Sequence, residues 1–204
     1  MHLMFLGKPG SGKGTQAALL SKKLSIPAIS IGQILRKIGS SNSSLAKKIR
    51  MYTDKGNLIP AQLSIDILKK RLSEKDCKKG YILDGFPRNL MQAKLWKEPV
   101  DKVFLIDIPN KIVLERIIYR RNCIKGHLHN LKTNPPKNQN YCDVCGEKLT
   151  IREDDKPTVI KNRLAIFKKN SLPAIHFYKK KNMLVRVDGN LSVQETFAEI
   201  LKHI

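Results

Sequence analysis

Short apolar runs alternate along the chain with longer segments in which apolar residues recur every three or four positions. The apolar runs fall at His2–Leu6, Ala28–Ile31, Tyr81–Leu83, Val103–Ile108 and Met183–Val187. The segments with helical spacing fall at 16–24, 61–73, 89–97, 111–121, 158–180 and 192–203. Buried strands that alternate with helices build a parallel sheet covered on both faces. The pattern therefore predicts an α/β fold with a doubly wound parallel sheet.

Two stretches interrupt this alternation. Residues 32–59 hold two helical patterns separated by the polar turn "SSNSS" at 40–44, which predicts a small helical insertion. Residues 122–157 hold three of the four cysteines and few apolar side chains, so they cannot form a helix within a core. We expect this second stretch to be a loop-rich lid with a local cross-link of its own.

A glycine-rich loop follows the first apolar run and precedes the first helical segment. It reads "GKPGSGKGTQ" and has the spacing of a phosphate-binding loop that ends at Lys13, but Gly14 stands where Ser or Thr is usual. Glycines allow the backbone to wrap round a phosphate, the helix N-terminus attracts the anion, and the lysine adds a positive charge. The loop predicts a phosphate site formed by Gly10, Ser11, Gly12, Lys13, Gly14 and Thr15.

Asp84 ends the predicted strand in "YILDGFPR". Ligands of parallel sheets lie at the carboxyl ends of the strands, so Asp84 is expected to face the same crevice as the glycine loop. Hydrated Mg²⁺ keeps several of its waters and needs few protein ligands, and one carboxylate can hold it through water. A hydroxyl after Lys13 then becomes dispensable, Gly14 lets the backbone come close, and Thr15 is free to contact phosphate.

With these motifs in place, the chain resembles the adenylate kinases of the long-lid bacterial type. The resemblance covers essentially the whole length and is carried by "GKPGSGKGTQ", "ISIGQILR", "GNLIP", "LDGFPRNLMQA", "ERIIYRR", "TNPP", "CDVCGEKLTIREDD" and "NRLAIF". It implies transfer of a phosphoryl group from MgATP to AMP to give two ADP. It also implies a nucleotide-binding core formed by 1–29, 60–116 and 158–204, an AMP-binding insertion at 30–59 and a lid at 117–157.

The resemblance assigns roles to six of the ten arginines. It implies catalytic roles for Lys13, Arg88, Arg120, Arg152 and Arg163, and ATP contacts from Arg116 and Arg120 in addition to the loop. It implies AMP contacts from Ile31, Arg36, Asn57, Leu58, Ile59, Gly85, Arg88, Gln92, Arg152 and Arg163, with Gln92 at the adenine. Fixed cations suit phosphoryl transfer because negative charge spreads over the oxygens of the transferred group. Arg116 and Arg120 are four residues apart in a predicted helix, so we expect them to share one face.

Two positions depart from the family pattern. Ile31 and Gln33 stand where the family usually has Thr and Asp, which removes a hydroxyl near the AMP base and a carboxylate that orders water around magnesium. Asp154 and Asp155 match an acidic pair near the lid hinge, and an ordinary solvated turn is the alternative for them.

The lid holds a candidate zinc site. Cys142-Asp-Val-Cys145 followed by Gly146 is a knuckle suited to tetrahedral thiolate ligation. The first pair of the family's four-cysteine version is broken and reads Cys123-Ile-Lys-Gly-His127-Leu-His129. We expect zinc bound by three cysteines and one histidine, with His127 preferred to His129, and Cys77 taking no part. A metal-free lid with reduced cysteines remains the alternative.

Composition adds limits on partners and location. The net charge is +22, but 29 of the 39 basic residues are lysines dispersed through the chain, which is typical of a solvated coat, so a nucleic-acid partner is not expected. We expect a cytoplasmic monomer, since neither a membrane span nor a signal peptide is visible. The rival functions are a UMP or CMP kinase on the same fold, and a nucleic-acid-binding zinc protein with a vestigial nucleotide site.

Overall fold

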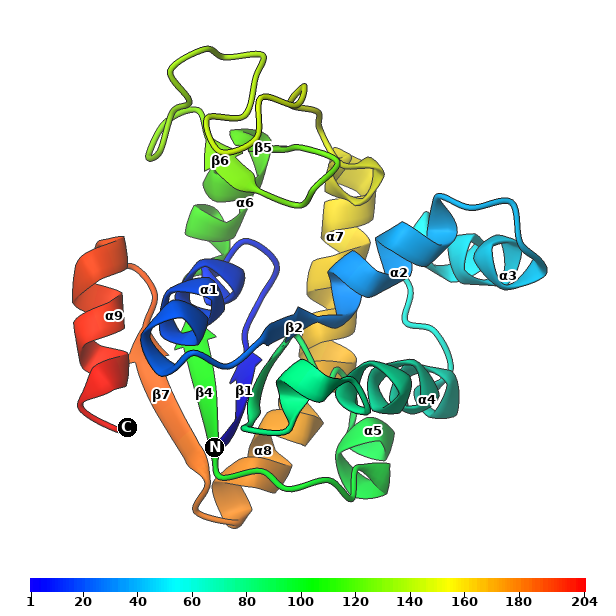
Figure 1. The fold of residues 1–204 in the computed structure, drawn as a ribbon, viewed down its shortest axis with the longest axis vertical. Coiled ribbons are helices and arrows are strands. Elements are labelled where there is room, and N and C mark those ends of the chain that lie inside the picture. Colours follow the sequence, from blue (N-terminus) through cyan, green and yellow to red (C-terminus); the bar gives the residue numbers. More distant parts are fainter.

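A five-stranded parallel sheet forms the centre of the computed structural model, which describes residues 1–204 (Figure 1). Its strand order is β2-β3-β1-β4-β7. The strands are β1 (His2–Leu6), β2 (Ala28–Ser30), β3 (Tyr81–Asp84), β4 (Lys102–Asp107) and β7 (Leu184–Asp188). Each of them lies within two residues of an apolar run in the sequence. The predicted doubly wound parallel sheet is confirmed.

The first strand lies in the middle of the sheet, and its side chains alternate between two separate cores. Leu3 and Phe5 face a core completed by α1 (Lys13–Leu24) and α9 (Val193–Leu201). Met4 and Leu6 face the opposite core, to which Ile31, Leu35 and Ile49 contribute along with three helices that follow residue 60. These helices are α4 (Ala61–Leu72), α5 (Leu90–Leu95) and α8 (Leu172–Lys180). Covering on both faces explains why the strands read as continuous apolar runs.

Two helices fall within the expected insertion, α2 (Ile31–Gly39) and α3 (Ser44–Thr53), and they project to one side of the sheet in Figure 1. The polar turn expected at 40–44 separates them. Ser43 ends this turn and caps α3, because its side chain accepts a hydrogen bond from the backbone N–H of Ala46 at 3.1 Å.

The segment expected to form the lid contains a short antiparallel hairpin that the sequence did not predict. Its strands are β5 (Arg120–Asn122) and β6 (Leu128–Asn130). Three-residue strands of polar side chains lack the alternation by which strands are recognised. Helix α6 (Asn110–Ile118) leads into this hairpin, and the expectation that Arg116 and Arg120 share a helix face is wrong. The helix stops because the Asn130 side chain donates to Arg116 O at 3.0 Å and the Leu131 N–H to Tyr119 O at 2.9 Å.

The long helix predicted at 158–180 is interrupted in its middle. It consists of α7 (Pro157–Ile166), a π-helical turn at Phe167–Ser171 and α8. Pro173 has no N–H to continue the α-helical pattern, and the Leu172 N–H bonds back five residues to Phe167 O. Two short 3₁₀ turns, η1 (Lys75–Cys77) and η2 (Glu153–Asp155), complete the fold. No helix has both the length and the apolar character needed to cross a membrane.

Leu20 and Leu19 provide a test of this packing. Leu20 is 0% exposed between α1 and the sheet, whereas its neighbour Leu19 is 36% exposed. Leu20→Ala should lower the free energy of unfolding by about 2–5 kcal/mol through lost burial and a cavity, and Leu19→Ala by no more than about 0.5 kcal/mol. Urea titration of both variants measures the two values. Equal losses would show that α1 does not pack as described.

Candidate active site and lid cluster

The glycine loop connects β1 to α1 and forms a concave, positively charged surface. Gly10 and Gly12 have left-handed φ angles of 74° and 94°, and Gly12 is the N-cap of α1. The Lys13 ammonium folds back over the loop and donates to Lys8 O at 3.2 Å. Arg116 reaches the same loop from α6, with its guanidinium 3.3 Å from Ser11 O. Together these groups present N–H donors and two cations to one point, which is the arrangement that binds phosphate.

Asp84 lies against Gly14. A Cβ atom at Gly14 would be 3.3 Å from the Asp84 carboxylate, so a larger residue there would press on this acid. Asp84 Oδ1 is buried and has no hydrogen-bond partner in the protein. An unpaired carboxylate oxygen at the end of a strand, beside a phosphate loop, fits a hydrated magnesium ion. Thr15 is exposed at the loop surface.

Arg88 is held at three points. Its backbone N–H donates to Gln92 Oε1 at 2.6 Å, its Nε donates to Gly85 O at 2.8 Å, and its carbonyl accepts from Ser171 Oγ at 2.9 Å. Ser171 ends the π-helical turn, which rotates this hydroxyl toward Arg88. Nothing in the sequence marks Ser171, because its contact depends on a helix irregularity that residue spacing does not reveal.

Two guanidinium groups converge beside Gly32 on α2. A Cβ atom there would lie 3.3 Å from both Arg36 Nη1 and Arg88 Nη2. Two arginines directed to one spot provide the planar donors that recognise a phosphate.

Asp154 and Asp155 form ion pairs with arginines on the lid side of the crevice. Asp155 is 6% exposed and accepts from Arg120 Nε at 2.8 Å and from Arg163 Nη1 at 3.1 Å. Asp154 lies 3.0 Å from Arg163 and 3.9 Å from Arg36. The two acids are therefore structural partners of the site and not a solvated turn, the alternative that the sequence left open. Arg152 lies on the same side, and its Nε is buried without a partner.

Burial and the neighbouring charges shift the acid–base equilibria of the site. Burial, reinforced by neighbouring arginines, lowers the pKa of Lys13 to about 8. Burial and Arg163 lower the pKa of Arg88 to about 10, and burial and Arg120 lower that of Arg152 to about 9. Burial favours the neutral form of Asp154, but Arg163 and Arg36 outweigh it, and the pKa of this acid is lowered. The site has an excess of positive charge that a polyphosphate would neutralise.

Two adjacent cavities open between these elements. The larger, of about 570 Å³, lies among Lys13, Gly56, Arg88, Arg163 and the π-helical turn. The smaller, of about 310 Å³, is lined by the predicted base-binding residues together with others. Its lining comprises Ile31, Leu35, Thr53, Asn57, Leu58, Ile59, Ser64, Phe86, Arg88 and Gln92. Apolar side chains line both cavities beside charged and polar groups, a combination that suits a ligand with an apolar base and an anionic phosphate.

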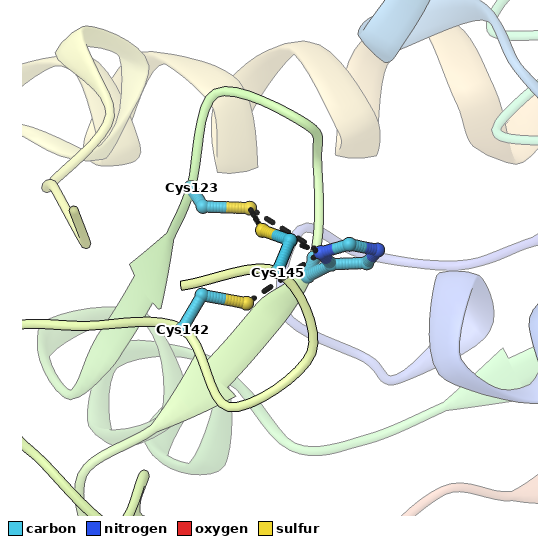
Figure 2. A group of neighbouring side chains, drawn as sticks. Cys123, Cys142 and Cys145 are labelled. Carbon is cyan, nitrogen blue, oxygen red and sulfur yellow. Dashed lines mark hydrogen bonds between the residues drawn. The ribbon is translucent and has the colours of Figure 1, made fainter. Parts of the chain in front are cut away.

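Three cysteines and one histidine of the lid come together at the end of the hairpin (Figure 2). His127 Nδ1 lies 3.5 Å from Cys123 Sγ, 3.5 Å from Cys142 Sγ and 3.3 Å from Cys145 Sγ, and all four ligand atoms lie within 4.8 Å of one another. Such a donor set could hold a metal ion such as zinc. His129 stands outside this group.

His129 contacts one member of the cluster, Cys142, without belonging to the four-residue donor set. It is 6% exposed, and its Nε2 lies 3.4 Å from Cys142 Sγ. Burial alone would raise the pKa of Cys142, but the hydrogen bond with His129 and backbone N–H donors lower it to about 6. Cys142 therefore favours the thiolate form that a metal needs. Cys77 is buried elsewhere, with its sulfur 3.0 Å from Arg71 Nη1.

Gln33 contacts the lid across the crevice. Its Nε2 donates to Gly126 O at 3.3 Å, in the loop between Cys123 and His127. The residue that replaces a family carboxylate thus joins α2 to the lid.

Comparison with known proteins gives one consistent result. The family model described as adenylate kinase matches residues 5–183. The chain is 42% identical over 212 residues to the adenylate kinase of Clostridium novyi, covering 100% of this chain and 98% of the relative. It is 43% identical over 208 residues to that of Archaeoglobus fulgidus, with 98% and 96% covered. It is 44% identical over 210 residues to that of Caldicellulosiruptor bescii, with 99% and 98% covered.

The glycine loop, the acid at the end of β3 and the converging arginines agree with this match along almost the whole chain. The protein therefore belongs to the adenylate kinase family and is an enzyme that converts ATP and AMP into two ADP.

Proposed function

We propose that Lys13, Arg88, Arg120, Arg152 and Arg163 are the catalytic cations of this phosphoryl transfer. The observation that carries the proposal is their convergence, with Arg36, on one crevice where only Asp84, Asp154 and Asp155 oppose them. The transferred group has a dispersed negative charge and requires no covalent help from the protein. Positioned cations therefore supply most of the stabilisation.

ATP occupies the side of the glycine loop in this proposal. Backbone N–H groups from Gly10 to Thr15 surround its phosphates, Lys13 places its ammonium on them, and Arg116 and Arg120 close from the lid side. Asp84 would hold magnesium through water, and this ion would supply neutralisation of phosphate charge. The unpaired Asp84 oxygen supports this assignment.

AMP occupies the side of α2 and α3. Arg36 and Arg88 bind its phosphate beside Gly32, and Gly85 forms the turn below them. The base enters the smaller cavity among Ile31, Leu58, Ile59, Asn57 and Gln92. Arg152 and Arg163 lie between the phosphate chain of ATP and the single phosphate of AMP. Asp154 and Asp155 hold Arg163 and Arg120 in position until the phosphates replace or join them as partners.

We propose three parts for the chain, as the resemblance implies. Residues 1–29, 60–116 and 158–204 form the core, 30–59 the AMP-binding insertion, and 117–157 the lid, which closes over ATP. Cys123, His127, Cys142 and Cys145 bind a structural zinc ion in the lid, because four protein donors leave no open coordination position.

We also infer a cytoplasmic monomer that binds ATP, AMP and ADP. All four cysteines are free thiols, and thiolate zinc ligands persist in a reducing compartment.

Removing a cation should abolish most activity without unfolding the protein. Lys13→Ala and Arg88→Ala should each lower kcat/KM by at least about a hundredfold, since each deletes transition-state charge stabilisation. Steady-state ADP formation measures this, and circular dichroism checks the fold. The matched controls are Lys168→Ala and Arg186→Ala, which are exposed and should stay within a factor of two or so. Catalytic variants as active as these controls would remove Lys13 and Arg88 from the mechanism.

Activity should fall at alkaline pH because Lys13 must carry its proton to bind phosphate. With its pKa lowered to about 8 in the free enzyme, kcat/KM for MgATP should decline as pH rises above 8, approaching about tenfold per unit. In the complex, phosphate stabilises the ammonium, so the decline in kcat should begin at higher pH. Initial rates between pH 7 and 9.5 test both statements. A flat kcat/KM profile across this range would contradict the assigned charge.

The lid should hold one zinc ion per chain. Cys142→Ser and His127→Ala should lose the metal and lower Tm, because zinc binding contributes to folding of this loop-rich segment. His129→Ala and the matched control Cys77→Ser should retain it. Metal analysis of protein purified without chelator, together with thermal unfolding, measures these effects. Less than about half an equivalent in the wild type would exclude a zinc site of the expected affinity, and retention in His127→Ala with loss in His129→Ala would reassign the fourth ligand.

A further inference from the structure

A chain of hydrogen bonds runs through the buried wall of the smaller cavity. The Arg88 N–H donates to Gln92 Oε1 at 2.6 Å, Gln92 Nε2 donates to Ser64 Oγ at 3.1 Å, and the Ser64 hydroxyl reaches Pro60 O at 3.3 Å. Gln92 and Ser64 are each 2% exposed, so water does not compete for these bonds. Both side chains line the cavity to which the base of AMP is assigned.

The two ends of this chain fix its direction. The Arg88 N–H can only donate and the Pro60 carbonyl can only accept. The hydroxyl of Ser64 therefore gives its hydrogen to Pro60 and keeps a lone pair for Gln92. With both ends satisfied in this way, the Gln92 amide has its oxygen toward Arg88 and its nitrogen toward Ser64. The reversed amide would place its NH₂ group against the Arg88 N–H and leave a buried donor unpaired, which is costly.

The orientation of this amide decides which base it can recognise. Gln92 has one N–H and one oxygen lone pair left over. An adenine edge offers an exocyclic amine as donor beside a ring nitrogen as acceptor, and a fixed amide can pair with both. Hypoxanthine has a carbonyl and a ring N–H at the same two positions, so its pattern is inverted. An amide oriented to pair with adenine therefore faces donor with donor and acceptor with acceptor when hypoxanthine is bound, and these buried polar groups stay unpaired.

We propose that Ser64 is a positioning residue that tunes the acceptor-base specificity of the enzyme by holding the nitrogen end of the Gln92 amide, while the Arg88 N–H holds its oxygen end. This inference rests on the proposed contact between Gln92 and adenine. Ser64 lies in the first turn of α4, and its hydroxyl bonds the carbonyl four residues back, as helical Ser and Thr often do. Ile31, buried on the same cavity, carries no polar group, and the other hydroxyl of the lining, that of Thr53, donates to Ile49 O at 3.2 Å, so Ser64 supplies the hydroxyl that meets Gln92.

The test compares AMP with inosine monophosphate, which differs at the recognised edge. Ser64→Ala should lower the ratio of kcat/KM for AMP to that for inosine monophosphate by about fivefold, the usual effect of one neutral hydrogen bond. Ser64→Thr keeps the hydroxyl and should keep the ratio. Ser171→Ala removes another buried hydroxyl, on the Arg88 carbonyl, and should lower both activities together without changing the ratio.

Two further variants make the outcome decisive. Gln92→Leu should lower the ratio at least as far as Ser64→Ala, and an unchanged ratio in Gln92→Leu would overturn the proposed role of Gln92 itself. A lowered ratio in Gln92→Leu with an unchanged ratio in Ser64→Ala would overturn the inference about Ser64 alone. If thermal unfolding shows that Ser64→Ala does not fold, Ser64→Cys takes its place. This variant replaces the hydroxyl by a weak acceptor of similar size, and it should also lower the ratio. An unchanged ratio in Ser64→Cys would equally refute it.

Discussion

The excess of buried positive charge around the crevice is the constraint on which the rest of the structure depends. Six cations reach this space, and three carboxylates oppose them. Their mutual repulsion and desolvation appear as lowered pKa values for Lys13, Arg88 and Arg152. The repulsion among these cations destabilises the free protein and is relieved when a polyphosphate binds. The folded protein therefore has the charges in position before any substrate arrives. Asp154 and Asp155 keep the arrangement tolerable by pairing with the arginines nearest the lid.

Holding cations in place requires a stiff backbone, and several local irregularities provide it. Gly14 allows the helix after the glycine loop to lie against Asp84. The π-helical turn at Phe167–Ser171 gives up regular helix geometry to bring Ser171 onto the Arg88 carbonyl. The backbone N–H, the carbonyl and the Nε of Arg88 are then all engaged in hydrogen bonds. Each irregularity is a departure from local preference that the surrounding packing maintains, as is common at functional sites.

The sequence predicts those parts of the molecule that depend on periodicity and on local motifs. The five strands follow from apolar runs, the glycine loop follows from its motif spacing, and the place of Asp84 follows from the rule that ligands lie at strand ends. The sequence fails where a contact depends on distant partners. Arg120 looked helical because its four-residue spacing from Arg116 is helical, yet Asn130 and Leu131 end the helix before it. Ser64 and Ser171 carry no sequence signal because hydrogen bonds across the fold define their roles.

The lid shows how a segment with little apolar surface can still position a cation. Its only core is a group of Cys123, Cys142 and Leu149, with Cys145 packed against it. Strand β5 runs from Arg120 directly into Cys123, and β6 begins directly after His127. The cluster therefore clamps the two strands at the same end of the hairpin, and a metal bound there would fix their register. Since Arg120 pairs with Asn130 at the other end, the geometry of its guanidinium beside Asp155 depends on a cluster that never touches substrate.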